Sequence, residues 1–225
     1  MVEIIQWPLL DRQTSLRAFI EFNSREAGAN LHGIGQTITP NVQRWRISLS
    51  IGEYADPDKI KEFEALVAEM RGRENIAALP IYDGFGYDHE VAPKQELFSD
   101  GTGFSDGTGF EAFGLGVEPP TVTVAAAAGT NEMTIGVTDP LRPNLRRGDL
   151  FSLNGWLHRV VRQTAGGWVK FEPEARRVIP VGAVLRTAPP VIYCRFLDAQ
   201  QGARARGRMS RGEAITLEFE EAFDR

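Results

Sequence analysis

Cysteine is nearly absent from this chain of 225 residues, because Cys194 is the only one. A single thiol excludes an internal disulfide and a thiolate metal cluster. The three histidines, His32, His89 and His158, show no metal-binding spacing such as H-x-x-x-H. We therefore expect no metal site, and no motif indicates a cofactor.

Long apolar runs are absent as well. No stretch approaches the roughly 20 apolar residues that span a bilayer, so we expect no membrane insertion. The N-terminus also lacks the basic region, apolar stretch and cleavage site of a secretion signal. These absences predict synthesis in the cytoplasm, followed at most by release within a larger particle.

Charge is unevenly distributed along the chain. Residues 120–211 carry 14 Lys/Arg and 6 Asp/Glu, whereas the remainder carries 11 basic and 24 acidic residues. Two surfaces with different neighbours would explain this difference, as would two modules that merely differ in composition. The arginines are not interleaved with aromatic residues, so dedicated nucleic-acid binding is not expected.

The clearest predicted element is a helix over residues 57–71. Asp56 can cap its first amides, Pro57 suits the first helical position, and Gly72 can close the last turn. One face is apolar, because hydrophobic residues recur at three- and four-residue steps: Ile60, Phe63, Leu66, Val67 and Met70. This helix is expected to lie on a sheet.

Two groups of strands are predicted around this helix. The first lies before and after it, and the second follows the paired prolines at 119–120 and ends at those of 189–190. Residues 24–40, between two strands of the first group, are expected to form a loop or an extended arm. The predicted strands are 2–9, 14–23, 43–51 and 75–82, then 121–128, 132–137, 149–153, 156–162, 168–171 and 183–187, and finally 191–197 and 214–223.

These elements predict a mainly β (α+β) fold with two domains. The last two strands are expected to rejoin the first sheet, so that residues 1–119 and 191–225 form one domain. Residues 120–190 then form an inserted domain, which the short strands and turn signals such as Asn154-Gly155 and Gly166-Gly167 indicate to be a small antiparallel β-barrel or sandwich.

Residues 83–119 lose periodicity and contain the unit Phe-Ser-Asp-Gly-Thr-Gly twice, at 98–103 and 104–109. The stretch 103–107 formally matches the G-x-S-x-G nucleophile motif. That motif requires a strand before the serine and a helix after it, and both are missing around Ser105. A repeated turn is therefore the preferred interpretation, and its role is left open.

Other candidate sites in the sequence are also weak. A calcium loop built from Asp100, Thr102, Ser105 and Asp106 would have glycines and a phenylalanine at required ligand positions. A carboxylate pair for glycoside cleavage within 83–90, from Asp83, Asp88 and Glu90, is explained as well by a polar turn.

Three further motifs have simpler structural interpretations. His158 lies in a predicted strand, where a structural role is expected. Residues 32–36 (HGIGQ) lack the third glycine and the helix of a dinucleotide motif. The arginine-rich stretch 200–212 is interpreted as a hairpin tip that faces solvent or an acidic neighbouring subunit. We expect no catalytic residue, and hence a protein that is not an enzyme.

Three short motifs resemble the distal tail proteins of long-tailed, non-contractile phages (siphophages) and related gene transfer agents. They are Glu69–Asn75 (EMRGREN) at the end of the helix, Arg147–Val160 (RGDLFSLNGWLHRV), and Thr216–Ala222 (TLEFEEA). The resemblance implies a belt domain, which is a tail-tube-like β-sandwich with one flanking helix, and a small β-barrel domain carried by it.

The resemblance also implies a virion structural protein at the tail tip. Belt domains of this family assemble into a ring, expected here to be a hexamer, that joins the tail tube protein to the hub or baseplate. Further implied partners are tape measure and receptor-binding proteins, with DNA only in transit through the channel during genome ejection. Residues 24–40 and 83–119 are candidates for contacts between subunits.

Two alternatives remain open at this point. The chain could be a carbohydrate- or receptor-binding module of a virion, with Trp156, Trp168 or Tyr193 stacking on sugars, although large aromatics more often lie in cores. It could also be a small hydrolase that uses the region 83–90 or Ser105.

Overall fold

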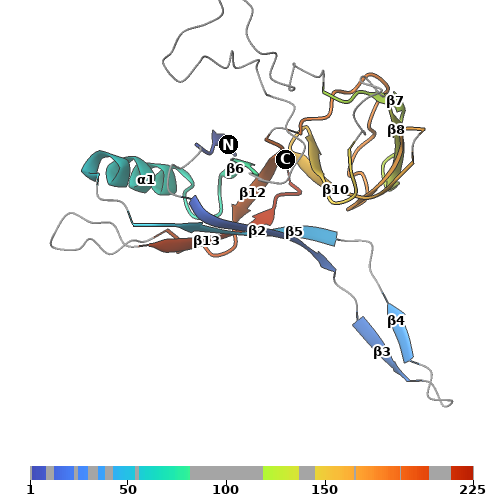
Figure 1. Ribbon diagram of the computed structural model, residues 1–225. Helices are drawn as coiled ribbons and strands as arrows, with labels where there is room; N and C mark the ends of the chain where they lie inside the picture. The colour runs from blue at the N-terminus through green and yellow to red at the C-terminus, as the bar shows by residue number, and fades with distance from the viewer. Residues whose placement is uncertain are drawn as a thin grey trace, which may run out of the picture. The chain divides into compact units, whose positions relative to one another are not determined.

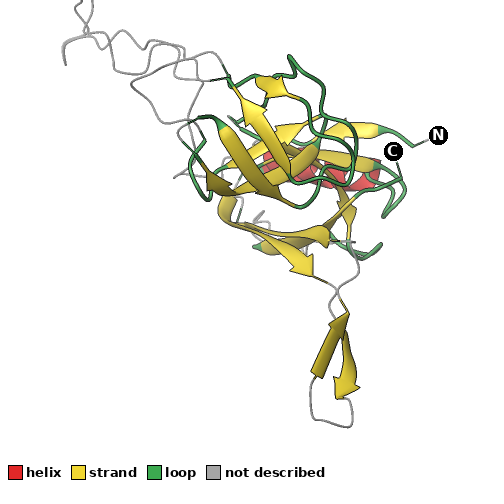
Figure 2. Ribbon diagram, turned by 90° about the vertical axis from the view of Figure 1, so that its right-hand side faces the viewer, coloured by secondary structure: helices red, strands yellow, loops and turns green. Residues whose placement is uncertain are grey.

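The computed structural model describes most of the chain in two units. The first unit is Met1–Ile81 with Val191–Arg225, and the second is Tyr82–Pro190. Figure 2 shows that strands predominate, and the described part contains one helix, α1. The described residues are 2–8, 13–22, 25–29, 35–38, 43–53, 56–81, 119–136, 145–164, 166–187, 189–202 and 214–224.

A six-stranded sheet dominates the first unit (Figure 1). Its strand order is β1-β6-β12-β13-β5-β2; β1 is parallel to β6 and every other pair is antiparallel. The last two strands of the chain thus lie between β6 and β5, which confirms that they rejoin the first sheet. The bounds are β1 Ile4–Gln6, β2 Gln13–Phe22, β5 Gln43–Ile51, β6 Ile76–Pro80, β12 Val191–Phe196 and β13 Ile215–Glu221.

Strict alternation along β5 separates the two faces of this sheet. Trp45, Ile47, Leu49 and Ile51 are all buried, while the residues between them are half-buried. The buried Trp7 ring meets two phenylalanine rings edge-on, that of Phe196 at 6.1 Å and that of Phe219 at 5.3 Å between centroids. One face of the sheet is therefore the core face.

Helix α1 (Pro57–Glu69) lies along the sheet in Figure 1. As predicted, the Asp56 side chain accepts a hydrogen bond from the Asp58 amide at 2.9 Å, and Pro57 begins the helix. Its buried residues, Ile60, Phe63 and Leu66, belong to the predicted apolar stripe, and the C-cap residue Met70 is buried as well, whereas Val67 is only half-buried.

The predicted end of the helix at residue 71 is wrong by two residues. Arg71 has a φ of 46°, in the left-handed region, so an α-helix cannot include it. Gly72 follows with a φ of 66°, and a Cβ there would lie 3.1 Å from the Ala199 carbonyl oxygen. The turn after the helix therefore needs glycine for its backbone conformation and for close approach.

A separate hairpin occupies the region predicted as a loop or an arm. Its strands, β3 (Arg25–Ala29) and β4 (Gly35–Ile38), pair with each other in antiparallel fashion. Pairing of β2 with β5 runs out to Phe22 opposite Gln43, and the hairpin pairing resumes at Arg25 opposite Ile38. Along the chain, the hairpin thus continues the ribbon formed by β2 and β5.

The second unit contains a curled five-stranded antiparallel sheet (Figure 1). Its order is β7-β8-β11-β10-β9, with inward side chains such as Phe151, Val160 and Phe171 in its core. Because Asn154 and Gly155 both have positive φ (50° and 76°), they form the tight turn that the sequence predicts between β9 and β10. The bounds are β7 Val122–Val124, β8 Glu132–Ile135, β9 Leu150–Leu153, β10 Trp156–Gln163 and β11 Trp168–Glu172.

The predicted strand 183–187 is wrong, since that stretch makes only isolated bridges. These bridges nevertheless connect both sides of the curled sheet: Val184 pairs with Thr121 beside β7, and Arg186 pairs with Ser152 in β9. Backbone groups of Ser152 and Arg186 exchange hydrogen bonds of 2.8 and 2.9 Å. The segment therefore ties the two edge strands of a half-barrel to each other.

The second unit is inserted between two neighbouring strands of the first unit, because the chain leaves the first unit after β6 and returns to it at β12. Pro80 of β6 lies directly opposite Val191 of β12 in the antiparallel pair. Residues 82–118 lie outside the described residues, so the predicted boundary at 119 stays a prediction. For the described part of the first unit, the layer that covers the core face is α1.

Candidate functional site

The face of the six-stranded sheet opposite the core carries alternating polar and charged side chains. On β5 these are Arg44, Arg46, Ser48 and Ser50. The register places Glu220 of β13 opposite Arg46. Neighbouring strands thus set oppositely charged side chains side by side on one face.

Glu220 is the centre of an ion-pair network on this face. It is only 8% exposed, and it accepts hydrogen bonds from Arg44, at 2.7 Å, and from Arg73. Arg46 lies 3.3 Å from the same carboxylate and also binds Glu21 at 2.9 Å. Because guanidinium groups from β5 and from the turn after α1 share one carboxylate, the network connects these two elements to β13.

The turn Glu69–Asn75 connects α1 to this network. Arg73 reaches Glu220 from the turn, and the buried Asn75 donates to the Glu69 carbonyl at 2.8 Å. The Asn75 side-chain oxygen accepts from the Glu3 amide at 3.1 Å. The first motif of the resemblance is therefore a joint between the helix, β1 and the last strand of the chain.

In the described part of the chain, the two edge strands of the sheet carry exposed apolar side chains. The edge strand β2 exposes Phe19 (42%) and Phe22 (55%), and the Arg17 guanidinium lies 5.5 Å from the centre of the Phe19 ring. At the opposite edge, Ile4 of β1 is 44% exposed, as is Val2 just before it (48%). Exposed apolar groups on an unpaired strand edge are typical of interaction surfaces.

His158 occupies the core of the second unit, as a structural histidine would. It is 2% exposed, stacks on Phe151 at 5.2 Å, and meets Phe171 edge-on at 4.9 Å. Its Nδ1 donates to the Pro173 carbonyl at 2.8 Å. Burial lowers the pKa of His158 to about 4; the Pro173 hydrogen bond opposes this change, and the charge of Arg176 adds to it.

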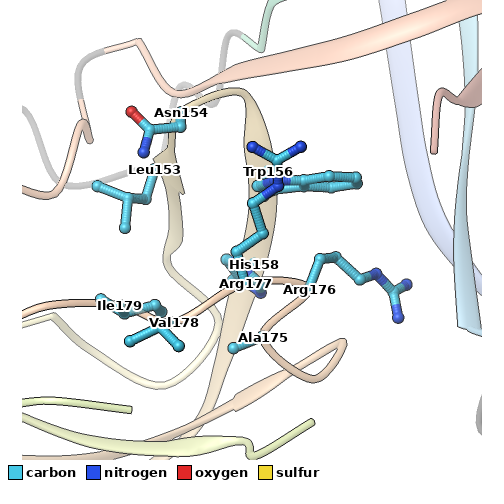
Figure 3. Close-up of a pocket in the computed structure, with 9 residues that line it drawn as sticks. All are labelled: Leu153, Asn154, Trp156, His158, Ala175, Arg176, Arg177, Val178 and Ile179. Atoms are coloured by element: carbon cyan, nitrogen blue, oxygen red, sulfur yellow. The ribbon is translucent and has the colours of Figure 1, made fainter. Parts of the chain in front are cut away.

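A small pocket opens beside His158 (Figure 3). Its buried floor is formed by Trp156, His158, Ala175 and Ile179. The remaining lining residues are half-buried or exposed: Leu153, Asn154, Arg176, Arg177 and Val178. The pocket volume of about 20 Å³ is enough for one water-sized group.

None of the three aromatic residues considered for sugar stacking is exposed. Trp156 is buried at 7% exposure, and Trp168 and Tyr193 are half-buried on strands of different units. Stacking of a sugar needs an open ring face, so this version of carbohydrate binding gains no support from the described geometry.

Several residues weighed in the sequence lie outside the described residues, and the interpretations that rest on them stay predictions. Among the residues that the structure does describe, no group of three or more metal-binding side chains comes together. The undescribed candidates are His32, Asp83, Asp88, His89, Glu90, Asp100, Thr102, Ser105, Asp106 and the arginines at 204, 206, 208 and 211.

Sequence reasoning did not anticipate the buried acids at the end of the chain. Glu220 (8% exposed) is followed by Glu221 (2%), whose carboxylate accepts from the Trp45 amide at 3.2 Å. The signal was present, because the run Phe219–Ala222 breaks the alternation of a half-buried strand. The partners Arg44 of Glu220 and Trp45 of Glu221, however, each lie 176 residues earlier in the chain.

No helix in the described part of the chain combines the length and the apolar character of a membrane span. Comparison with models of known protein families finds no match to this chain, and comparison with curated proteins finds none either.

Proposed function

We propose that this protein is a ring-forming structural component of a siphophage-type tail tip. In this proposal a hexameric ring joins the tail tube to the hub or baseplate and leaves an axial channel for DNA. The observation that supports assembly most directly is the pair of sheet edges, each with exposed apolar side chains.

Head-to-tail contact uses both edges at once. The ten-residue edge strand β2 of one copy would meet the short edge strand β1 of the next, covering Phe19 and Phe22 on one side and Ile4 on the other. Such a contact joins two different surfaces, so repeating it either closes a ring or extends without limit. A ring with one closed symmetry is the form that a tail tip requires.

The two units would have separate roles in the ring. The first unit, with its sheet and α1, would be the tail-tube-like belt domain, and the half-barrel of the second unit would be the small domain carried by the belt. The β3–β4 hairpin, within the region 24–40, would contact a neighbouring subunit. Tail tube and hub proteins would bind above and below, with tape measure or receptor-binding proteins as further partners.

The oligomeric state of the purified full chain tests this proposal. Light scattering coupled to size-exclusion chromatography, with negative-stain images of the same fractions, is expected to show closed rings. The variant Phe22→Ser should lose the ring while its circular dichroism stays unchanged. Val124→Ser, which alters a residue of similar exposure (56%) in the second unit, should still form rings.

A mixing experiment distinguishes the head-to-tail contact from any other. Phe22→Ser leaves the β1 edge intact, and Ile4→Ser leaves the β2 edge intact, so the two variants together retain one good contact. They should form a heterodimer and no ring. The proposal would be contradicted if the unaltered chain were monomeric at every concentration. It would also be contradicted if both variants still formed rings.

A further inference from the structure

The second unit carries a surface of exposed valines. In the described part of this unit, the exposed large hydrophobic side chains are all valines on two short stretches, each between 52% and 64% exposed: Val124, Val178, Val181 and Val184. Residues 119–131 and 178–185, which contain these valines, include no Lys, Arg, Asp or Glu. Exposed apolar side chains that gather in this way are typical of contact surfaces.

Backbone pairing brings the two stretches side by side. Isolated antiparallel bridges join Thr121 to Val184 and Ala126 to Ile179. The register between these bridges places the exposed valine of β7 opposite Val181, and residues opposite each other in an antiparallel pair share one face. The four exposed valines therefore belong to one surface, which we call the valine face.

The chain itself supplies an apolar segment next to the valine face. Residues 82–118 lie outside the described residues, belong to the second unit and lead directly into Pro119. They contain the repeated unit Phe-Ser-Asp-Gly-Thr-Gly, so phenylalanines recur at six-residue steps, at positions 98, 104 and 110. The Pro120 carbonyl accepts a hydrogen bond from the Leu185 amide at 2.9 Å, next to Val184. The segment thus ends beside the valine face.

Net charge also favours contact between this segment and the rest of the second unit. Residues 82–118 carry eight Asp/Glu and one Lys, a net charge of −7 with histidine neutral. Residues 119–190 carry nine Lys/Arg and five Asp/Glu, a net charge of +4. Opposite charges attract over a distance of about 8 Å at physiological ionic strength. The acidic segment is therefore drawn toward the basic module that carries the valines.

The segment is long enough to cover the valine face. An extended chain spans about 3.3 Å per residue, so the stretch from Phe110 to Pro119 reaches up to about 30 Å. The stretch from Val178 to Val184 is at most about 20 Å long on the same basis. We propose that residues 98–110 bind the valine face of their own chain, with the phenylalanine rings on the valine side chains. This contact lies within one chain, so it does not depend on ring formation by the first unit.

Methyl NMR of the full chain with ¹³C-labelled valine tests the proposal. Replacing Phe98, Phe104 and Phe110 together by serine should shift the methyl signals of the four valines, because the ring currents are lost. The methyl signals of Val2, an exposed valine of the first unit, are the internal reference. The control variant Phe85→Ser removes a phenylalanine outside the repeat and should leave the valine signals unchanged. Unchanged valine signals in the triple variant would overturn the proposal.

Chymotrypsin cleavage after Phe104 and Phe110 measures the same contact from the side of the segment. The double variant Val181→Ser/Val184→Ser should accelerate this cleavage at least about tenfold, because cleavage follows the population of the unbound segment. The control Val2→Ser alters a residue of similar exposure (48%) in the first unit and should cleave at the rate of the unaltered chain. Equal rates for the two valine variants would contradict the proposal.

A mixing experiment distinguishes binding within one chain from binding to a neighbouring copy. The ¹³C-labelled triple serine variant is mixed with an excess of the unlabelled, unaltered chain. We expect its valine signals to keep the shifts of the variant, since each segment occupies its own valine face at the high effective concentration that a tether provides. Recovery of the unaltered signals would assign the segment to a neighbouring copy and would overturn the proposal.

Discussion

The Glu220 network makes a strong prediction about stability. The substitution Glu220→Gln keeps the size of the side chain but removes the charge that Arg44, Arg46 and Arg73 share. These arginines come from β5 and from the turn after α1, so the variant should loosen the joint between the helix, β5 and the last strand. We expect the first unit to become less stable.

The size of the effect follows from the burial of the partners. Removing one partner of a fully buried ion pair costs about 3–5 kcal/mol. Here the side chain of Glu220 is 10% exposed, but the side chains of Arg44, Arg46 and Arg73 are 33%, 23% and 50% exposed, so water screens them in part. We therefore expect a loss of about 2–3 kcal/mol, which shifts the urea midpoint by about 1–1.5 M for an m-value of about 2 kcal/mol/M.

Urea unfolding monitored by tryptophan fluorescence measures this loss. A background in which Trp156 and Trp168 are replaced by phenylalanine leaves Trp7 and Trp45 as reporters of the first unit. The control is Glu218→Gln, an exposed glutamate two residues earlier on β13, which should change stability by less than about 0.5 kcal/mol. If the midpoints of the two variants coincide, the network contributes nothing and the reasoning fails.

Three further predictions concern single residues. The pKa of His158 is about 4 in the folded protein and about 6.5 when unfolded, so the unfolded state binds a proton first as the pH falls. The stability that the neutral ring contributes is fully present above pH 6.5 and decreases by about 3 kcal/mol by pH 4. Urea titrations of the second unit should show this loss, and the variant His158→Asn should lack it. Gly167→Ala should destabilise the second unit by more than about 3 kcal/mol, because the new Cβ would lie 2.4 Å from the Ile135 carbonyl oxygen. The control Gly129→Ala has a similar φ (81° against 80°) but open space, so it should cost only the backbone strain of about 1–2 kcal/mol. Equal melting temperatures of the two variants would refute the steric explanation. Asn75→Ala should lower the free energy of unfolding, measured by thermal denaturation, by about 2 kcal/mol, because the Glu3 amide and the Glu69 carbonyl lose their hydrogen-bond partner. The control is Glu74→Ala, a substitution of the exposed neighbouring residue, which should differ little from the unaltered chain.

Local patterns in the sequence were sufficient for most elements. The cap at Asp56, the alternation along β5 and the Asn154–Gly155 turn all act between residues close in the chain, so each could be read directly. Interactions between distant residues could not be predicted in this way. Nothing near Glu220 reveals the arginines that surround it, and nothing near His158 reveals the Pro173 carbonyl or the pocket beside it.

The missed helix end and the absent strand have the same origin. Arg71 is an ordinary helix former in isolation, but the close approach of Gly72 to Ala199 fixes the chain there in a left-handed turn. The stretch 183–187 has strand-like composition, but Val184 pairs with Thr121 and Arg186 pairs with Ser152 on a different strand. The stretch therefore forms isolated bridges instead of a continuous ladder. Tertiary contacts therefore determine both the end of the helix and the absence of a strand at 183–187.

The pairing of Pro80 with Val191 gives the second unit the topology of a hairpin loop of roughly 110 residues between two adjacent strands. Loop-closure entropy grows only with the logarithm of length, so this loop costs about 3 kcal/mol more than a four-residue turn. An insertion of nearly any length is therefore tolerable at this point. Over evolutionary time, such a chain could exchange the module between β6 and β12 for another, or lose it to a short turn, while the six-stranded sheet keeps its register.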